Sequence, residues 1–334
     1  MAFKGWRKIK IKNDESFVEA VAPIIISASR STDIPAFYSD WFFERLKKGY
    51  LSWVNPFNRK EQLVAFDQTR CIVFWTKNAQ PIIKHLKELD RRNINYYFSY
   101  TLNNYSNELE PNVPELRKRL NTFKQLSELL GKERVIWRFD PLIIGNTLTI
   151  NELFERIFVV GEKIHKYTNK LVFSFIDIAN YSRVKRNLEQ AGAFTEFTQQ
   201  LMKEVGLKLN QMNRQWKLSL ASCSENVDLS EFDIEHNRCV DDRLMIKLFS
   251  KDERLMDFLG YTGLQGNLFE KEDSYNELKD KGQRKECGCI VSKDIGSYNT
   301  CLNLCKYCYA NHSDKLVQNN YRKHQKDKNK TSII

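Results

Sequence analysis

The sequence predicts an α/β fold built as a (β/α) barrel, either of TIM type or as a partial barrel of six repeats. Six short apolar segments recur between residues 23 and 221, and helical sequence follows each of the first five. Each segment also ends in small, polar or charged residues, as strands do at the carboxyl edge of a barrel. Polar residues after all six segments favour a closed or nearly closed ring over an open sheet with one crevice.

The strands are expected at 23–29, 71–75, 96–101, 134–138, 171–176 and 216–221, because each is a continuous apolar or β-branched run of the kind buried in parallel sheets. Helices are expected at about 36–48, 79–90, 114–130 and 149–166, with helical sequence from the fifth strand to about 213 and again at 241–249. In the helix at 114–130, Leu116, Leu120, Phe123 and Leu130 share one face. Residues 6–11 alternate like a short, half-exposed strand.

Composition suggests one large domain with basic ends. The chain has 334 residues, and 42% of them are hydrophobic, which supports a sizeable core. We expect a basic segment at 1–22, the barrel core at 23–250, a cysteine-rich, metal-binding extension on the barrel mouth at 251–312, and a disordered basic tail at 313–334. No apolar run reaches 18 residues and no signal-peptide core is recognisable, so we expect a cytoplasmic protein without membrane contact.

The net charge of +11 is concentrated at the two ends of the chain. Residues 1–12 hold five Lys or Arg residues and no acid, and residues 311–334 hold six against two acids. Only +2 remains for the body at 13–310. The composition therefore does not indicate a basic groove for nucleic acid through the fold, although the ends could attract polyanions.

Three cysteines near the end of the chain, Cys301, Cys305 and Cys308, have the spacing of metal ligands. Eight cysteines in a reducing compartment favour metal ligation over disulfides. Structural zinc sites and passive iron–sulfur clusters take four protein ligands, so a three-cysteine site leaves a coordination position open for chemistry. The alternative is a zinc knuckle that another cysteine or His312 completes.

Four further cysteines could form a second, complete site. Cys287 and Cys289 flank one glycine, which lets both thiolates turn toward one centre, while Cys223 and Cys239 lie after the sixth strand. Together they could close a tetrathiolate site for an auxiliary iron–sulfur cluster or a zinc ion. His236 could replace one of them. Alternatively, Cys223 and Cys239 are buried apolar residues, as free cysteines often are.

Charged residues after the strands are candidates for the barrel mouth. Arg30, Lys77 and Arg138 could bind carboxylates or phosphates, and arginine suits a carboxylate because it can bind it through two hydrogen bonds. Partners or ribose contacts are expected from Asp33, Asp140 and Asp177. The alternative is that these residues form salt bridges among themselves.

The spacing of Cys301, Cys305 and Cys308, with Tyr307 before the last cysteine, resembles the cluster loop of radical S-adenosylmethionine (SAM) enzymes. The Tyr-Cys-Tyr-Ala run is most similar to the spore photoproduct lyase branch. This resemblance implies a [4Fe–4S] cluster whose fourth iron binds SAM, a flavodoxin- or ferredoxin-like electron donor, and catalytic roles for Arg30, Asp33, Lys77, Arg138 and Asp140. It also implies cofactor contacts, for which the candidates are Tyr307, Asn78 and Asp177.

Residues 24–312 as a whole resemble a bacterial family catalogued only as a domain of unknown function (number eighteen-forty-eight). The shared blocks are SASRSTDIP at 27–35, FWTKN at 74–78, VIWRFDP at 135–141, SFID at 174–177, and the cysteine-rich segment at 287–310. Two features depart from radical SAM enzymes: the cluster loop follows the sixth strand rather than the first, and no glycine-rich segment follows the second. In a ring, strands one and six can be neighbours, so the loop could still reach the same mouth.

The sequence therefore predicts an iron–sulfur enzyme that cleaves SAM to start radical chemistry on an unknown substrate. The lyase-like loop makes nucleic-acid repair or modification one candidate substrate class. A zinc-dependent barrel hydrolase is an alternative, in which the metal activates water. Another is a non-enzymatic nucleic-acid-binding protein with a structural cysteine knuckle and basic ends.

Overall fold

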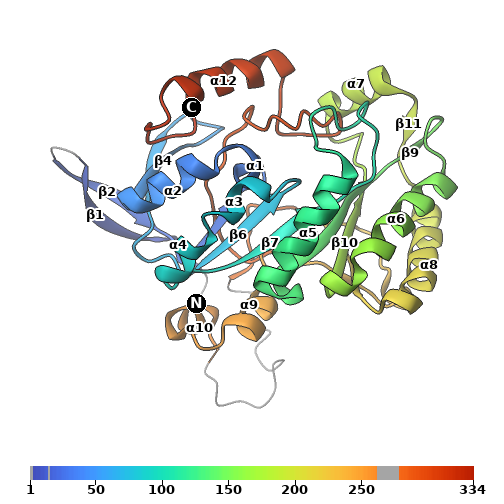
Figure 1. Cartoon of the computed structure of the whole chain (residues 1–334), viewed down its shortest axis with the longest axis horizontal. Coiled ribbons are helices and arrows are strands. Elements are labelled where there is room, and N and C mark those ends of the chain that lie inside the picture. Colours follow the sequence, from blue (N-terminus) through green and yellow to red (C-terminus); the bar gives the residue numbers. More distant parts are fainter. Residues whose placement is uncertain (1–2, 14–15, 262–277) are drawn as a thin grey trace.

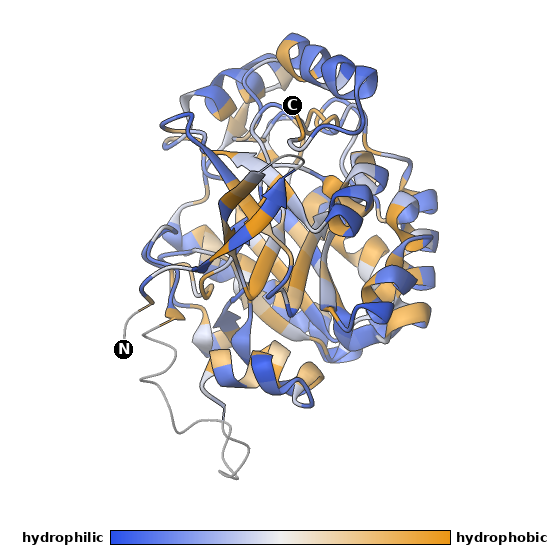
Figure 2. Cartoon of the chain, turned by 90° about the vertical axis from the view of Figure 1, so that its left-hand side faces the viewer, coloured by the Kyte–Doolittle hydropathy of each residue, from blue (hydrophilic) through white to orange (hydrophobic). Residues whose placement is uncertain are grey.

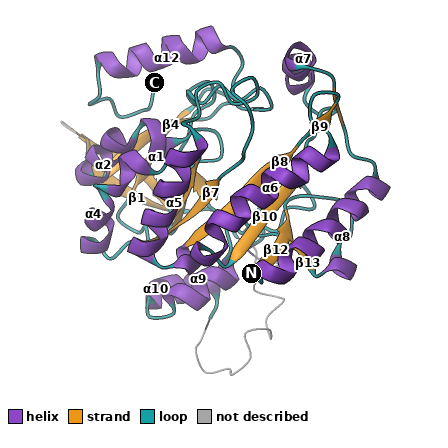
Figure 3. Cartoon of the chain, turned by 45° about the vertical axis from the view of Figure 1, so that its right-hand side comes forward, coloured by secondary structure: helices purple, strands orange, loops and turns teal. Residues whose placement is uncertain are grey.

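The computed structural model describes residues 3–13, 16–261 and 278–334, and its largest element is an eight-stranded, entirely parallel sheet (Figures 1 and 3). The strands lie in the order β14 (Lys293–Asp294), β3 (Ile25–Ala28), β6 (Cys71–Thr76), β7 (Asn95–Thr101), β8 (Val135–Leu142), β10 (Lys170–Phe175), β12 (Ser219–Ser222) and β13 (Ile234–His236). The order follows the chain from β3 to β13, with β14 added beside β3. The mixed α/β fold with a parallel sheet is thereby confirmed.

Long amphipathic helices cover one face of this sheet (Figure 3). They include α2 (Ser39–Lys48), α5 (Leu116–Leu130), α6 (Ile150–Ile164) and α8 (Gln199–Trp216). The other helices between the strands are α1 (Ile34–Phe37), α3 (Gln80–Ile83), α4 (Leu86–Arg91) and α7 (Ser182–Ala191). Phe74, Phe98 and Trp137 of the strands are fully buried against this helical layer. No described helix is both long enough and apolar enough to cross a membrane.

The opposite face of the sheet has its own core, because successive strand residues point to opposite sides. Val73, Tyr97 and Val172 project to this side and are buried. They pack with α9 (Asp242–Phe249), with α10 (Glu253–Leu259) and with the cysteine-bearing segments around Cys239 and Cys289. This face therefore places cysteine side chains against the middle of the parallel sheet.

The sixth strand begins at Ser219 rather than at the expected residue 216. Helix α8 continues to Trp216, and Lys217 then ends it with a left-handed conformation at φ 55°. Trp216 packs directly on α6 at Gly161, where an added Cβ would lie 2.2 Å from the indole ring. The aromatic ring thus belongs to the contact between two helices and not to the strand.

A second, four-stranded sheet was not expected from the sequence beyond its first strand. Its order is β1 (Arg7–Asn13), β2 (Ser16–Ala22), β5 (Glu61–Ala65) and β4 (Tyr50–Val54). It stands on the side of the molecule that faces the viewer in Figure 2. A two-stranded ribbon, β9 (Ile144–Gly145) with β11 (Phe194–Thr195), completes the described strands. The basic segment expected at 1–22 therefore contains the antiparallel pair of β1 and β2.

The end of the chain differs from the disordered tail that we expected. It forms α12 (Asp314–Lys326), which begins with Ser313 accepting a hydrogen bond from the Leu316 amide. Val317 is fully buried, and the Trp41 indole donates a 2.9 Å hydrogen bond to the carbonyl of Lys330. The prediction failed because a few residues of this segment, among them Val317 and His324, are buried against the fold although the segment as a whole is polar.

Replacing Val317 with alanine should lower the free energy of unfolding by about 1–3 kcal/mol, because it removes a buried side chain and leaves a cavity. Urea unfolding followed by circular dichroism measures this change. The matched control is Lys315→Ala, an exposed position in the same helix, which should change stability by less than about 0.5 kcal/mol. Equal effects of the two variants would contradict a docked helix.

Candidate functional site

The three-cysteine loop (residues 301–308) lies against the segment that leaves β3, although the two are far apart in sequence. The side-chain oxygens of Thr32 and Thr300 are 2.7 Å apart. Tyr38 donates a 2.8 Å hydrogen bond to the carbonyl of Thr300, and Tyr309 donates one of 3.2 Å to the carbonyl of Arg30. The loop therefore reaches the carboxyl end of the first strand, as the sequence led us to expect.

Asp33 fastens this loop to two strand ends. One carboxylate oxygen accepts hydrogen bonds from the Ala36 amide and the Thr76 hydroxyl, at 3.1 and 2.7 Å. The other accepts from the Lys77 amide at 2.8 Å and from the Asn303 side chain at 3.0 Å. Burial raises the pKa of this carboxyl above its ordinary value, against the four donors. All of its hydrogen-bonding capacity is used within the protein, so Asp33 positions the loop.

The thiols of Cys301, Cys305 and Cys308 lie in one small buried region. Burial raises the pKa of Cys301 to about 12 and raises the pKa values of Cys305 and Cys308 as well. A negative charge on a neighbouring thiolate of the loop would also raise the pKa values of Cys301 and Cys305. Without a bound cation these thiols are therefore neutral, and a metal would have to displace their protons.

Tyr307 and Lys77, both predicted site residues, belong to one buried network. The Lys77 amine lies 2.8 Å from a carboxylate oxygen of Glu110 and 2.9 Å from the Tyr307 hydroxyl. The Tyr307 hydroxyl in turn donates to Glu110. Burial acts to raise the pKa of Glu110, but Lys77 and Arg119 outweigh it and hold that pKa below its usual value. The network anchors the third cysteine through its neighbour, Tyr307.

The four-cysteine set (Cys223, Cys239, Cys287 and Cys289) is brought together by segments that follow β12 and precede β14. The sulfurs of Cys223 and Cys239 are 3.5 Å apart, and Cys289 interacts with the thiols of both Cys239 and Cys287. Its sulfur accepts hydrogen bonds from the amides of Cys239 and Val240, at 3.3 and 3.4 Å. The sequence therefore grouped four residues that are neighbours in space.

Gly288 permits this arrangement. An added Cβ at this position would lie 2.8 Å from the carbonyl oxygen of Asn237, closer than real side chains come. Contacts among the thiols lower the pKa of Cys223 to about 6 and lower that of Cys289, while they raise those of Cys239 and Cys287. The set thus holds thiolate character before any metal binds.

Two predicted arginines contact the four-cysteine set. Arg138 donates a 2.8 Å hydrogen bond to the Cys239 sulfur and a 2.6 Å hydrogen bond to Asp140. The guanidinium of Arg30 interacts with Cys289. The two guanidinium groups lie 5.3 and 5.4 Å from the ring centroid of Trp75, so both contact one indole. One terminal nitrogen of Arg30 (Nη2) is buried without a hydrogen-bond partner among the described residues.

Two predicted cofactor contacts have other partners. The Asn78 side chain accepts a 3.2 Å hydrogen bond from the Gln80 amide at the start of α3. Asp177 forms a 2.7 Å salt bridge with Arg284, just before the Cys287 pair. Asn78 therefore supports a helix start, and Asp177 ties the loop after β10 to the cysteine-rich segment. The described contacts of neither residue include a cysteine sulfur.

Sequence reasoning missed the buried acid Glu110 and assigned no role to the half-buried Glu225. Glu110 lies in a loop whose residues show no periodicity, so nothing in the sequence marked it. Glu225 lies two residues after Cys223, and its carboxylate accepts a 2.9 Å hydrogen bond from the Phe175 amide. Burial raises the pKa of Glu225 to about 7. Its position just after β12 was the available signal, because acids at that edge face the site.

Both sets consist of residues that bind metals, but within the described residues their side chains do not converge on one centre. As placed over residues 3–13, 16–261 and 278–334, no three His, Cys, Asp or Glu side chains form a group that could hold a metal ion. Loading either cysteine set would require its side chains to turn toward a common centre. Four sulfurs around zinc lie about 3.8 Å apart, by geometry from zinc–sulfur bonds of about 2.3 Å, which is close to the Cys223–Cys239 distance of 3.5 Å.

Comparison with known proteins identifies one match. The model of a protein family described as a domain of unknown function (DUF1848) matches residues 25–310. No curated protein and no solved structure matches the chain.

Replacing Asp33 with asparagine should destabilise the fold by about 1–3 kcal/mol, because an amide NH₂ would face two of the four donors. Urea unfolding measures this loss. The matched control is Asp67→Asn, which removes an exposed carboxylate that bonds only its neighbour Gln68 among its described contacts. If Asp33→Asn were as stable as the control, Asp33 would not be the anchor of the loop.

Proposed function

The chain belongs to the DUF1848 family, whose description assigns no function, and we propose that it is an iron–sulfur enzyme of the radical SAM type. One observation carries the proposal: three cysteines, one buried and two half-buried, lie in a loop that Asp33 and Tyr307 fasten to the carboxyl edge of a parallel sheet. In this proposal Cys301, Cys305 and Cys308 hold a [4Fe–4S] cluster and the sheet curves into the predicted barrel. The substrate is unknown.

The ligand count supports a reactive cluster. Three cysteines leave one iron of a [4Fe–4S] cluster open, and that iron can bind SAM and supply the electron that breaks it. A flavodoxin- or ferredoxin-like protein would deliver the electron. The chain's own contribution is partial burial, which raises the pKa values of all three thiols. The network of Lys77, Glu110 and Tyr307 would hold the loop rigid during turnover.

Arg30 is the strongest candidate for binding an anionic group of SAM or of the substrate. Its backbone carbonyl contacts Tyr309 beside the three-cysteine loop, and its guanidinium contacts Cys289 of the four-cysteine set. Because Nη2 is buried without a protein partner, it retains a hydrogen bond for a ligand carboxylate. Asp140 instead receives two hydrogen bonds from Arg138 and one from Ser174, so it fits a role in orienting Arg138.

The four-cysteine set would hold a second centre, either an auxiliary iron–sulfur cluster or zinc. Proximity of Arg30 and Arg138 to its sulfurs favours a centre that carries several thiolate charges. The Cys223–Cys239 spacing fits a single zinc ion. A zinc-dependent hydrolase is accordingly the second candidate function. Nucleic acid is one candidate substrate in the leading proposal, which the near-neutral body of the chain does not favour.

Protein purified without oxygen should contain iron and sulfide, and on reduction it should form 5′-deoxyadenosine from SAM. Cys301→Ala should lose about four irons per chain and all of this cleavage, because it removes one of three cluster ligands. Iron and sulfide analysis, electron paramagnetic resonance and chromatography of the nucleoside measure these outcomes. Cys71→Ala, a buried cysteine outside both sets, is the control and should keep both. Protein without iron would refute the proposal.

Cys289→Ala should remove the metal of the second centre and leave the iron of the three-cysteine loop in place. Cys289 contacts two of the other three thiols and accepts two amide hydrogen bonds, so its loss cannot be compensated by a neighbour. Elemental analysis of wild type and variant identifies the lost metal as iron or zinc. An unchanged metal content in Cys289→Ala would contradict a four-cysteine centre.

A further inference from the structure

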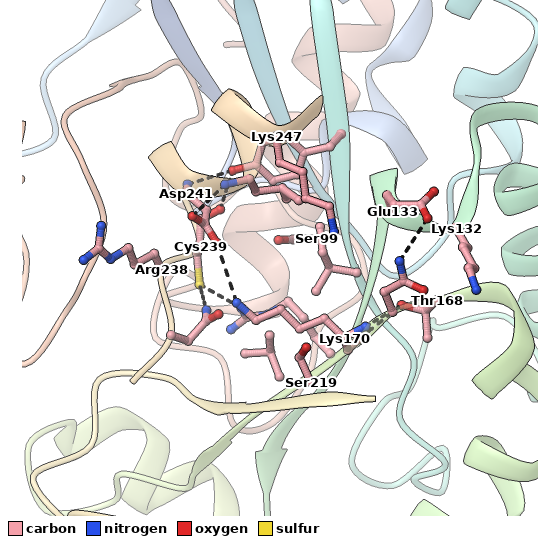
Figure 4. A pocket seen from close by; sticks show the side chains of 17 residues that line it. Ser99, Lys132, Glu133, Thr168, Lys170, Ser219, Arg238, Cys239, Asp241 and Lys247 are labelled. Carbon is pink, nitrogen blue, oxygen red and sulfur yellow. Dashed lines mark hydrogen bonds and ion pairs between the residues drawn. The ribbon is translucent and has the colours of Figure 1, made fainter. Parts of the chain in front are cut away.

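A cavity lies beside the amino-terminal ends of β10 and β12 (Figure 4). Its volume is about 110 Å³. Lys170 and Ser219, the first residues of β10 and β12, line its outer part, and Arg138 and Cys239 line its inner part. The cavity thus runs from the amino edge of the sheet to a member of the four-cysteine set. The proposed function makes no use of it.

The positive charge of the cavity lies at its opening. Five cationic side chains line it, and three of them have acidic partners: Arg138 with Asp140, Arg238 with Asp242 and Lys170 with Asp241. Asp241 lies 3.7 Å from the amine of Lys170, and Glu133 accepts a 3.0 Å hydrogen bond from Asn169. Within the described part of the chain, no carboxylate lies within ion-pair distance of Lys132 or Lys247. The opening therefore retains positive charge for an anionic ligand.

The inner end of the cavity offers a hydrogen-bond acceptor. Asn237, which is 2% exposed, donates a 2.9 Å hydrogen bond from its side-chain nitrogen to the Cys239 sulfur. Its side-chain oxygen is buried and has no hydrogen-bond partner among the described residues. A buried, unpaired amide oxygen is unfavourable unless a donor reaches it. A ligand with a hydroxyl or amine group at this end would supply that donor.

We propose that this cavity binds a small 2-hydroxy or 2-amino carboxylate. The carboxylate would lie toward Lys132, Lys170 and Lys247, and the hydroxyl or amine would donate to the side-chain oxygen of Asn237. The cavity volume of about 110 Å³ suits a small ligand. Because Asn237 also bonds Cys239, ligand binding is linked to the four-cysteine set. The inference does not depend on SAM chemistry.

Titration calorimetry of the full-length protein, purified without oxygen, tests the proposal with glycolate and glycine as probes. Acetate has the same carboxylate but no donor, so it should bind at least about tenfold more weakly than glycolate. Inorganic phosphate tests whether the cavity accepts any anion. Equal binding of glycolate and acetate, tighter binding of phosphate than of glycolate, or no binding of either probe at millimolar concentration would overturn the proposal.

Substitutions of lining residues test whether glycolate binds in this cavity. The double variant Lys132→Met/Lys247→Met, at two exposed positions, should weaken glycolate binding about tenfold or more, whereas Lys163→Met on the outer helix α6 should not change it. Asn237→Ala should reduce the preference for glycolate over acetate to near one, and circular dichroism confirms its folding. Unchanged affinity in the double variant would overturn the assignment to this cavity. The measurement needs no SAM cleavage, so its result is separate from that of the proposed function.

Discussion

The site depends on the parallel pairing of β14 with β3. Only two residue pairs form it, Lys293 with Ile26 and Asp294 with Ser27, yet it brings the end of the chain to the first strand. The Asp294 side chain strengthens the junction, since it accepts hydrogen bonds from the Ser27 hydroxyl and the Arg30 amide, each 2.9 Å long. A long segment returns here at a large cost in chain entropy, which several specific contacts must offset. Without this pairing the two cysteine sets would lie apart.

The same edge of the sheet concentrates buried charge, and pairing makes this tolerable. An isolated buried charge is very unfavourable, so each must have a partner of opposite sign. Lys77 has Glu110, and Arg138 has Asp140. Arg30 is different, because its contacts include a cysteine thiol and one of its nitrogens is unpaired. The carboxylates of Asp294 and Asp280 also interact with the Arg30 charge, and its unpaired nitrogen retains a hydrogen bond for a bound anion.

The sequence predicted the six central strands and both cysteine sets, because apolar runs and close cysteine spacing are local signals. The small sheet of β1, β2, β5 and β4 was missed beyond its first strand, since its strands are half-exposed and their pairing is set by contacts far apart in sequence. Helix α12 and Glu110 were missed for a similar reason: both are held by contacts with residues far apart in sequence. The polar residues at the carboxyl ends of the strands were predicted as a group. The partners of Asn78 and Asp177, however, could be identified only from the structure.

The two cysteine sets differ in how ready they are for a metal. Thiolate, not thiol, binds metal, so nearby positive charge and hydrogen-bond donors prepare a site. Arg138, Asn237 and two backbone amides donate to the sulfurs of Cys239 and Cys289. Around Cys301 and Cys305 burial dominates and keeps the thiols protonated. In the proposed function the four-cysteine set would therefore lose fewer protons on loading than the three-cysteine loop, where each thiol would release its proton to bind the cluster.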